Sequence, residues 1–260
     1  MMAHFKSHYL ERRSGQSKER YTILNNGCSF SIGKKIKNTF SYCEFLPGKV
    51  YNIGKSGSGI ESTRIQQFFN KKRKAKTQYD PRSESYYNDT HLTHFIYQIP
   101  DPSRQPIDLN EYSYEFMNCN DSSIWRCLSI DPKEREQPGW RDNYKNIFNN
   151  IQKYYNKSLG IIQQNINIIR DKFPNIKIIF LRYSHTRTPL IYEFNRLFYK
   201  DTITEYCNKH NITYIFEKTF NTNWFSKNTL TASDGARKGD KMHPNKTGAK
   251  LIANKIKEYL

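Results

Sequence analysis

Hydrophobic positions along this chain follow two patterns, one typical of strands and one typical of helices. The two patterns alternate from residue 21 to the C-terminus. Short runs of strand-forming residues predict five strands, at residues 21–26, 50–53, 94–99, 176–181 and 212–216. Apolar residues that recur every three or four positions predict helices from about residue 59, over 143–171 with a kink at Gly160, over 200–209 and over 245–260. Strands and helices in alternation predict a parallel sheet with helices on both of its faces.

For two of these elements the sequence also predicts which face is buried. The run at 176–181 is fully apolar, as in a parallel strand that is buried on both faces. On the last helix, four apolar residues are expected to form the buried face: Leu251, Ile252, Ile256 and Leu260.

The remaining segments are polar and lack a period. Residues 1–20 predict a flexible basic tail, and residues from about 101 to 142 predict an irregular insertion within a single domain at 21–260. The basic run at 71–76 is interpreted as a solvated helix end, with a phosphate-binding or nuclear-import patch as the alternative.

Length and composition fit one large α/β domain of 260 residues. The sequence has no apolar run of about 18 residues and no apolar segment near its start, so we expect neither a membrane span nor a secretory signal, and a cytoplasmic location. The five cysteines form no C-x-x-C pair, which indicates reduced thiols and no zinc site. His91, His94 and His210 also lack the spacing of metal ligands.

The net charge of +18 has two explanations. It could serve an anionic ligand such as nucleic acid, an anionic glycan or an acidic membrane surface. Lys, Asn, Ile and Tyr are abundant, however, and Val50 is the only valine, as in proteins from AT-rich bacterial or viral genomes. We favour the compositional explanation, which leaves nucleic acid as the less favoured partner.

Ser29 follows the first predicted strand, where a helix is expected to begin. A serine on such a turn exposes its hydroxyl near the positive end of the helix dipole, which suits a nucleophile whose attack creates an oxyanion. The neighbouring Cys28 is an alternative nucleophile, although we expect its side chain to pack as a small apolar group. A helix N-cap is the purely structural interpretation of Ser29.

A glycine-rich segment at 52–59 follows the second predicted strand. Its glycines let the backbone approach a ligand and direct N–H groups at it. Gly54, Lys55 and Ser56 spell the end of a P-loop, but that motif requires a glycine where Lys49 stands. A P-loop is therefore excluded.

Asp240 lies three residues before His243, directly ahead of the last predicted helix. In a tight turn the carboxylate can accept a hydrogen bond from Nδ1–H of the imidazole, which leaves Nε2 free as a general base. An ordinary hydrogen bond within a loop is the alternative.

Taken in chain order, the three motifs resemble the sequence blocks of the SGNH/GDSL hydrolase family, from about residue 21 to residue 260. Ser29 stands at the position of the family's nucleophile, Gly57 at that of its oxyanion glycine, and Asp240 and His243 at its D-x-x-H block. The resemblance implies a three-layer α/β/α sandwich with a mostly parallel five-stranded sheet. It also implies a Ser-His-Asp mechanism that needs no metal and no cofactor.

Two departures from the family pattern concern the site. Cys28 replaces the aspartate that usually precedes the nucleophile. The family's G-x-N-D block is absent after the third strand, where Gln98 is the residue that can supply an equivalent amide. The implied oxyanion hole is therefore the backbone N–H groups of Ser29 and Gly57 with the side chain of Gln98.

The expected reaction is removal of a small, acetyl-like acyl group from a carbohydrate or another small ester. Arg104 and His185 follow the third and fourth strands and are candidate substrate-binding residues, with ordinary surface positions as the alternative. An O-acyltransferase with the same triad is a second hypothesis. A third is a non-catalytic protein that binds a polyanion or glycan and retains a relict site.

Overall fold

The computed structural model describes residues 21–32, 40–54, 59–60, 63–70, 91–105, 140–182, 189–215 and 243–260. The expected N-terminal tail, the basic run at 71–76 and most of the expected insertion lie outside these ranges. The division into a tail and one domain therefore stays a prediction. No helix within the described ranges is both long and apolar enough to cross a membrane.

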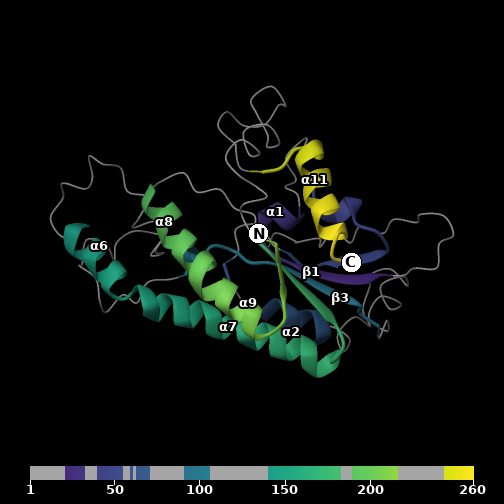
Figure 1. Cartoon of the computed structure of the whole chain (residues 1–260), viewed down its shortest axis with the longest axis horizontal. Coiled ribbons are helices and arrows are strands. Elements are labelled where there is room, and N and C mark those ends of the chain that lie inside the picture. Colours follow the sequence, from purple (N-terminus) through teal and green to yellow (C-terminus); the bar gives the residue numbers. More distant parts are fainter. Residues whose placement is uncertain are drawn as a thin grey trace, which may run out of the picture.

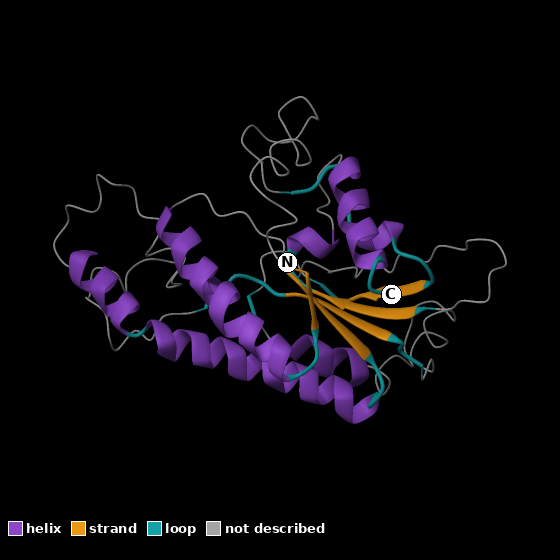
Figure 2. Cartoon of the chain, in the orientation of Figure 1, coloured by secondary structure: helices purple, strands orange, loops and turns teal. Residues whose placement is uncertain are grey.

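Five parallel strands form the sheet, in the order β2-β1-β3-β4-β5 (Figure 2). The strands are β1 (Thr22–Asn26), β2 (Lys49–Asn52), β3 (His94–Gln98), β4 (Lys177–Leu181) and β5 (Thr213–Ile215). All five coincide with runs that were expected to be strands. Because the strands are parallel, their carboxyl ends meet at one edge of the sheet.

Helices cover both faces of the sheet. Figure 1 shows α2, α7 and α9 on one side and α1 and α11 on the other. The described helical segments are α1 (Ser29–Ile32), η1 (Tyr42–Phe45), α2 (Thr63–Asn70), η3 (Pro102–Arg104), α6 (Trp140–Asn149), α7 (Ile151–Lys172), α8 (Pro189–Leu197), the π-helix η6 (Phe198–Ile203), α9 (Thr204–Lys209) and α11 (Lys246–Lys257). The three-layer α/β/α architecture is therefore confirmed.

Alternate side chains of each central strand enter two different hydrophobic clusters. On β4, Ile178 and Phe180 belong to the cluster under α2, α7 and α9, whereas Ile179 and Leu181 belong to the cluster under η1 and α11. Both sets are almost fully buried. The absence of polar alternation in this strand follows from burial on both faces.

The expected single helix over 143–171 is wrong in one respect, because the break lies at Asn150 and not at Gly160. Asn150 separates α6 from α7, and its side-chain amide donates to the carbonyl oxygen of Asn146 at 2.9 Å. Asparagine favours such local bonds to the backbone over regular helix. Gly160 lies inside α7, where an added Cβ would meet open space, so no close approach requires glycine there.

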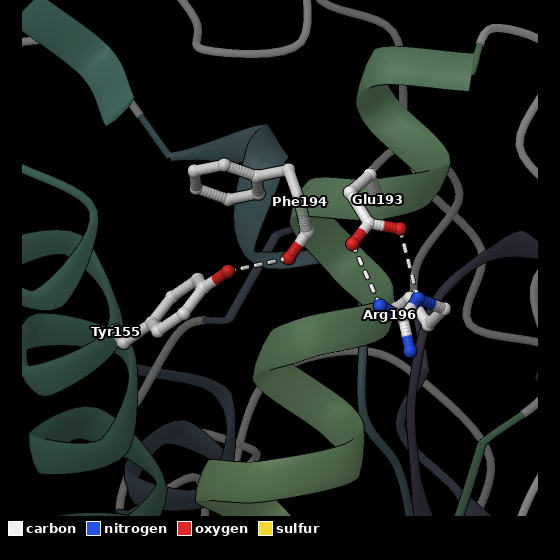
Figure 3. A network of polar contacts seen from close by, with 4 residues as sticks. All are labelled: Tyr155, Glu193, Phe194 and Arg196. Carbon is white, nitrogen blue, oxygen red and sulfur yellow. Dashed lines mark hydrogen bonds and ion pairs between the residues drawn. The ribbon is translucent and has the colours of Figure 1, made fainter. Parts of the chain in front are cut away.

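The helix expected at 200–209 begins earlier, at Pro189, and contains a π-helical segment. The proline takes the first helical position, where the missing N–H costs no hydrogen bond. Figure 3 shows the Tyr155 hydroxyl from α7 donating to the carbonyl oxygen of Phe194 in α8, at 2.7 Å. The carbonyl of Phe194 lies four residues before Phe198, where η6 begins, so the Tyr155 hydroxyl bonds to the carbonyl that would accept from Phe198 in a regular α-helix.

The buried face of α11 also differs from the expected one. Leu251 is 40% exposed. The residues that pack on the sheet and η1 include two alanines and a glycine: Gly248, Ala249, Ile252, Ala253 and Ile256. Small residues allow the helix to approach the sheet closely, which turns the larger Leu251 toward solvent.

Candidate active site

The turn that carries Ser29 lies where the sheet changes direction. The chain passes from β1 to β2 on one side and then to β3 on the other, so the carboxyl end of β1 adjoins both. Ligands of open α/β sheets bind at this position. Gly27 opens the turn, and an added Cβ there would lie 2.6 Å from Oε1 of Gln98 and from Oγ of Ser31, so only glycine fits.

Ser29 and His243 are brought together from opposite ends of the chain. Oγ of Ser29 lies 3.0 Å from Nε2 of His243, although 214 residues separate them in sequence. Both residues are buried. The side chain of Asn245 accepts a hydrogen bond from the Gly248 backbone at 2.9 Å and fixes the start of α11 directly after the histidine. A hydroxyl and an imidazole at this distance are in hydrogen-bond contact, which is the arrangement that nucleophilic catalysis by serine requires.

Gln98 holds the same turn from the end of β3. Its side-chain oxygen accepts from the backbone N–H of Cys28 at 2.9 Å. Because a backbone N–H can only donate, the oxygen of the amide must face Cys28. The Nε2 atom is buried and has no hydrogen-bond partner among the residues that the structure describes. An amide donor beside the turn that carries Ser29 is thus left for another acceptor.

The far side of the turn is also fixed by hydrogen bonds. Oγ of Ser31 donates to the carbonyl oxygen of Cys28 at 2.8 Å. The carbonyl oxygen of Ser31 accepts from Nδ2 of Asn52 at 2.8 Å and from Oγ of Ser41. These bonds hold the backbone of the helical turn that begins with Ser29.

Cys28 is turned into the core. Its side chain is 2% exposed and belongs to the cluster that contains Ile96, Ile252 and Ala253. It therefore packs as a small apolar group between the sheet and α11.

Three sequence-predicted site residues, Gly57, His185 and Asp240, lie outside the described residues, and their roles stay predictions. Arg104 is described and half-buried in η3. Its carbonyl oxygen would lie 3.5 Å from a Cβ added at Gly59, so η3 lies beside the end of the glycine-rich segment.

The sequence analysis missed a buried polar cluster at the same edge of the sheet. The Tyr199 hydroxyl, from η6, lies 2.9 Å from the carbonyl oxygen of Ile99 and 3.3 Å from Oδ1 of Asp101. The guanidinium of Arg182, directly after β4, lies 4.1 Å from the centre of the Tyr199 ring. Burial raises the pKa of the Tyr199 hydroxyl, so it stays a hydrogen-bond donor. The sequence did contain a signal for this cluster, because Arg182 is a charged residue directly after the apolar run at 176–181.

Among the described residues, no three His, Cys, Asp or Glu side chains lie close enough together to hold a metal ion.

Comparison with known proteins shows what this architecture is similar to. No protein-family model and no curated protein matches the chain. A lipase from a goat rumen metagenome has a TM-score of 0.50 at 13% identity, over 92% of this chain and 96% of its own. An acetyl xylan esterase from the rumen bacterium Butyrivibrio proteoclasticus has a TM-score of 0.49 at 10% identity, over 95% of this chain and 65% of its own. A G-D-S-L lipolytic protein from Veillonella parvula has a TM-score of 0.45 at 14% identity, over 91% of this chain and 96% of its own.

At identities this low the likeness shows the fold alone. The chain has an SGNH/GDSL-like fold, as the sequence blocks implied.

Proposed function

We propose that this protein is a serine hydrolase that cleaves carboxylic esters, with Ser29 as nucleophile and His243 as general base. The observation that carries the proposal is the 3.0 Å separation between Ser29 Oγ and His243 Nε2 at the carboxyl edge of the sheet. A relict site would have no need to keep these two polar side chains in contact and buried, so the contact favours an active enzyme over a non-catalytic binding protein.

In the first half-reaction, Ser29 Oγ attacks the acyl carbon and its proton passes to Nε2 of His243. The tetrahedral intermediate then collapses, the bond to the alcohol oxygen breaks, and His243 returns the proton to that oxygen. In the second half-reaction His243 removes a proton from water, the resulting hydroxide attacks the acyl-enzyme, and the acid leaves. Ser29 recovers its proton from His243.

Three donors are assigned to the oxyanion: the backbone N–H groups of Ser29 and Gly57 and the Nε2 group of Gln98. The lack of a hydrogen-bond partner for Gln98 Nε2 among the described residues supports this assignment for the side chain. Losing one donor of this kind costs about 3–4 kcal/mol of transition-state stabilisation.

Asp240 is assigned to the Nδ1 side of His243, on its spacing of three residues in the sequence. It would orient the imidazole and stabilise the imidazolium that forms during attack. Arg104 and His185 are assigned to the substrate, since both follow strands that end at this edge.

The proposed substrate is a small, acetyl-like ester of a carbohydrate or another small alcohol. The sequence near the motifs contains no amphipathic or long apolar segment that could enclose an acyl tail.

Hydrolysis of p-nitrophenyl esters tests the proposal. The wild-type protein should release p-nitrophenol from the acetate faster than from the octanoate, and Ser29→Ala should abolish both activities. A preference for the octanoate would contradict the small acyl group, and an inactive wild type would contradict the hydrolase. Transfer of acetyl to an added alcohol in preference to water would identify an acyltransferase with the same residues.

A further inference from the structure

A chain of hydrogen bonds connects three polar side chains beneath the nucleophile turn. The Tyr42 hydroxyl donates to Oδ1 of Asn25 at 2.7 Å, and Nδ2 of Asn25 donates to Oδ1 of Asn52 at 2.9 Å. Nδ2 of Asn52 then donates to the carbonyl oxygen of Ser31 at 2.8 Å. The chain therefore leads from η1, through β1 and β2, to the helical turn that begins with Ser29.

The direction of this chain is fixed by backbone groups. Oδ1 of Asn52 also accepts from the backbone N–H of Gly54 at 3.1 Å, which can only donate. Nδ2 of Asn52 must then face Ser31, whose carbonyl oxygen can only accept. Every donor in the chain points the same way, an arrangement in which each bond polarises the next.

Asn52 is the residue at which the nucleophile turn and the glycine-rich segment are joined. It holds the carbonyl of Ser31, two residues after the nucleophile, and the N–H of Gly54, at the start of that segment. A second side-chain donor to the Ser31 carbonyl is Ser41, the residue that caps the start of η1.

We propose that Asn52 is a positioning residue that sets the place of Ser29 relative to His243. This inference rests on the proposed function, because it assigns a role within the same site. The asparagine touches neither the nucleophile nor the base. It acts through the backbone of α1, and its loss would let the turn move away from the imidazole while the strand pairing of the sheet remains.

Two variants separate the contacts of this side chain. Asn52→Ala removes all three hydrogen bonds. Asn52→Asp keeps an acceptor for Gly54 and Asn25 but cannot donate to Ser31. This variant tests the inference if the alanine variant does not fold. Both should lower kcat by about 10- to 100-fold, since small misplacements of reacting groups have effects of this size, and leave KM within about twofold.

Asn165→Ala is the matched control. Asn165 is a fully buried amide on α7 that donates to the Tyr97 hydroxyl at 3.1 Å. Its removal should lower the melting temperature without changing kcat. The inference would be overturned if the control lost as much kcat as the Asn52 variants. It would also be overturned if the Asn52 variants kept kcat within about twofold of wild type.

A crystal structure of the alanine or aspartate variant tests the inference without any measurement of enzyme activity. The inference expects Ser29 Oγ to lie outside hydrogen-bond reach of His243 Nε2, and an unchanged separation of 3.0 Å would overturn it. An inactive wild type would instead count against the proposed function alone, so the two failures are distinguishable.

Discussion

The side-chain oxygen of Gln98 accepts a hydrogen bond from the backbone nitrogen of Cys28 across 70 positions of sequence. The contact joins the end of β3 to the residue before the nucleophile. One half of the glutamine amide thus has a structural task, while its Nε2 atom is buried with no partner among the described residues. The two halves can be tested separately.

Gln98→Glu should keep the structural half and lose the catalytic one. A carboxylate still accepts from Cys28, but it offers no N–H and places negative charge near the developing oxyanion. We expect kcat to fall by about 10²- to 10³-fold with little change in KM, as for the loss of an oxyanion donor. Steady-state kinetics with p-nitrophenyl acetate would show this, and a kcat within about threefold of wild type would remove Gln98 from the oxyanion hole.

The nucleophile can be distinguished from its neighbour with a fluorophosphonate probe. Wild type and Cys28→Ala should be labelled alike, whereas Ser29→Ala should not be labelled. The Cys28 side chain is almost fully buried in the core, and iodoacetamide should leave activity largely intact. Ester hydrolysis that survives in Ser29→Ala and disappears in Cys28→Ala would assign the chemistry to the thiol.

The pH dependence of kcat/KM should report the general base. His243 must be neutral to accept the Ser29 proton, so kcat/KM should fall at low pH as the imidazole becomes protonated. Asp240→Asn should keep the melting temperature and lower kcat by about 10⁴-fold, because the imidazole loses its orienting partner. If Asp240→Asn has wild-type kcat, Asp240 has no part in the mechanism.

His94 should make the fold sensitive to acid. It is buried on β3, its Nδ1 lies 2.9 Å from the Thr93 hydroxyl, and its Nε2 has no hydrogen-bond partner among the described residues. Burial, with a smaller effect from Lys177, lowers the pKa of His94 from 6.5 to about 4. Between these two pH values the unfolded chain binds a proton that the folded chain does not. The free energy of unfolding should therefore fall as the pH drops through this window, by at most about 3 kcal/mol.

Urea unfolding at several pH values measures this effect. His94→Asn can keep a polar contact with Thr93 but has no titratable group, so its free energy of unfolding should fall less than that of wild type between pH values of about 6.5 and 4. The carboxylates are common to both proteins and cancel in the comparison. Parallel curves for the two proteins would show that His94 is not responsible.

The strands and the order of the motifs could be predicted from sequence because both depend on local pattern. The run that forms β4 is apolar throughout, since both faces of the strand are covered, and this leaves a clear signal. The helix break was misplaced because glycine marks weak helix propensity, whereas the actual break depends on the side chain of Asn150 bonding to Asn146. Leu251 was misplaced because three of the five buried residues on α11 are alanine or glycine, which carry little hydrophobic signal.

The sequence predicted which residues form the site but not how they are arranged in space. Sequence blocks placed Ser29 and His243 at one edge of the sheet, and the 3.0 Å contact between them agrees with that placement. The hydrogen bonds of Asn52 and Gln98 could not be predicted, since they join residues whose proximity exists only after the strands have paired. The same holds for the contact of Tyr199 with Asp101, which joins η6 to the chain that follows β3.

The Tyr155 hydroxyl of α7 bonds to the carbonyl of Phe194, one turn before α8 passes into the π-helical segment η6. A π-helical turn holds more residues than an α-helical one, so every side chain after it is rotated about the helix axis relative to a regular continuation. Tyr199 is the second residue of that segment, and its hydroxyl reaches Ile99 and Asp101. In a regular α-helix the carbonyl of Phe194 would accept from the N–H of Phe198, and here it accepts from the hydroxyl of Tyr155 instead. The contact between α7 and α8 therefore lies directly before the segment from which Tyr199 reaches the chain that follows β3.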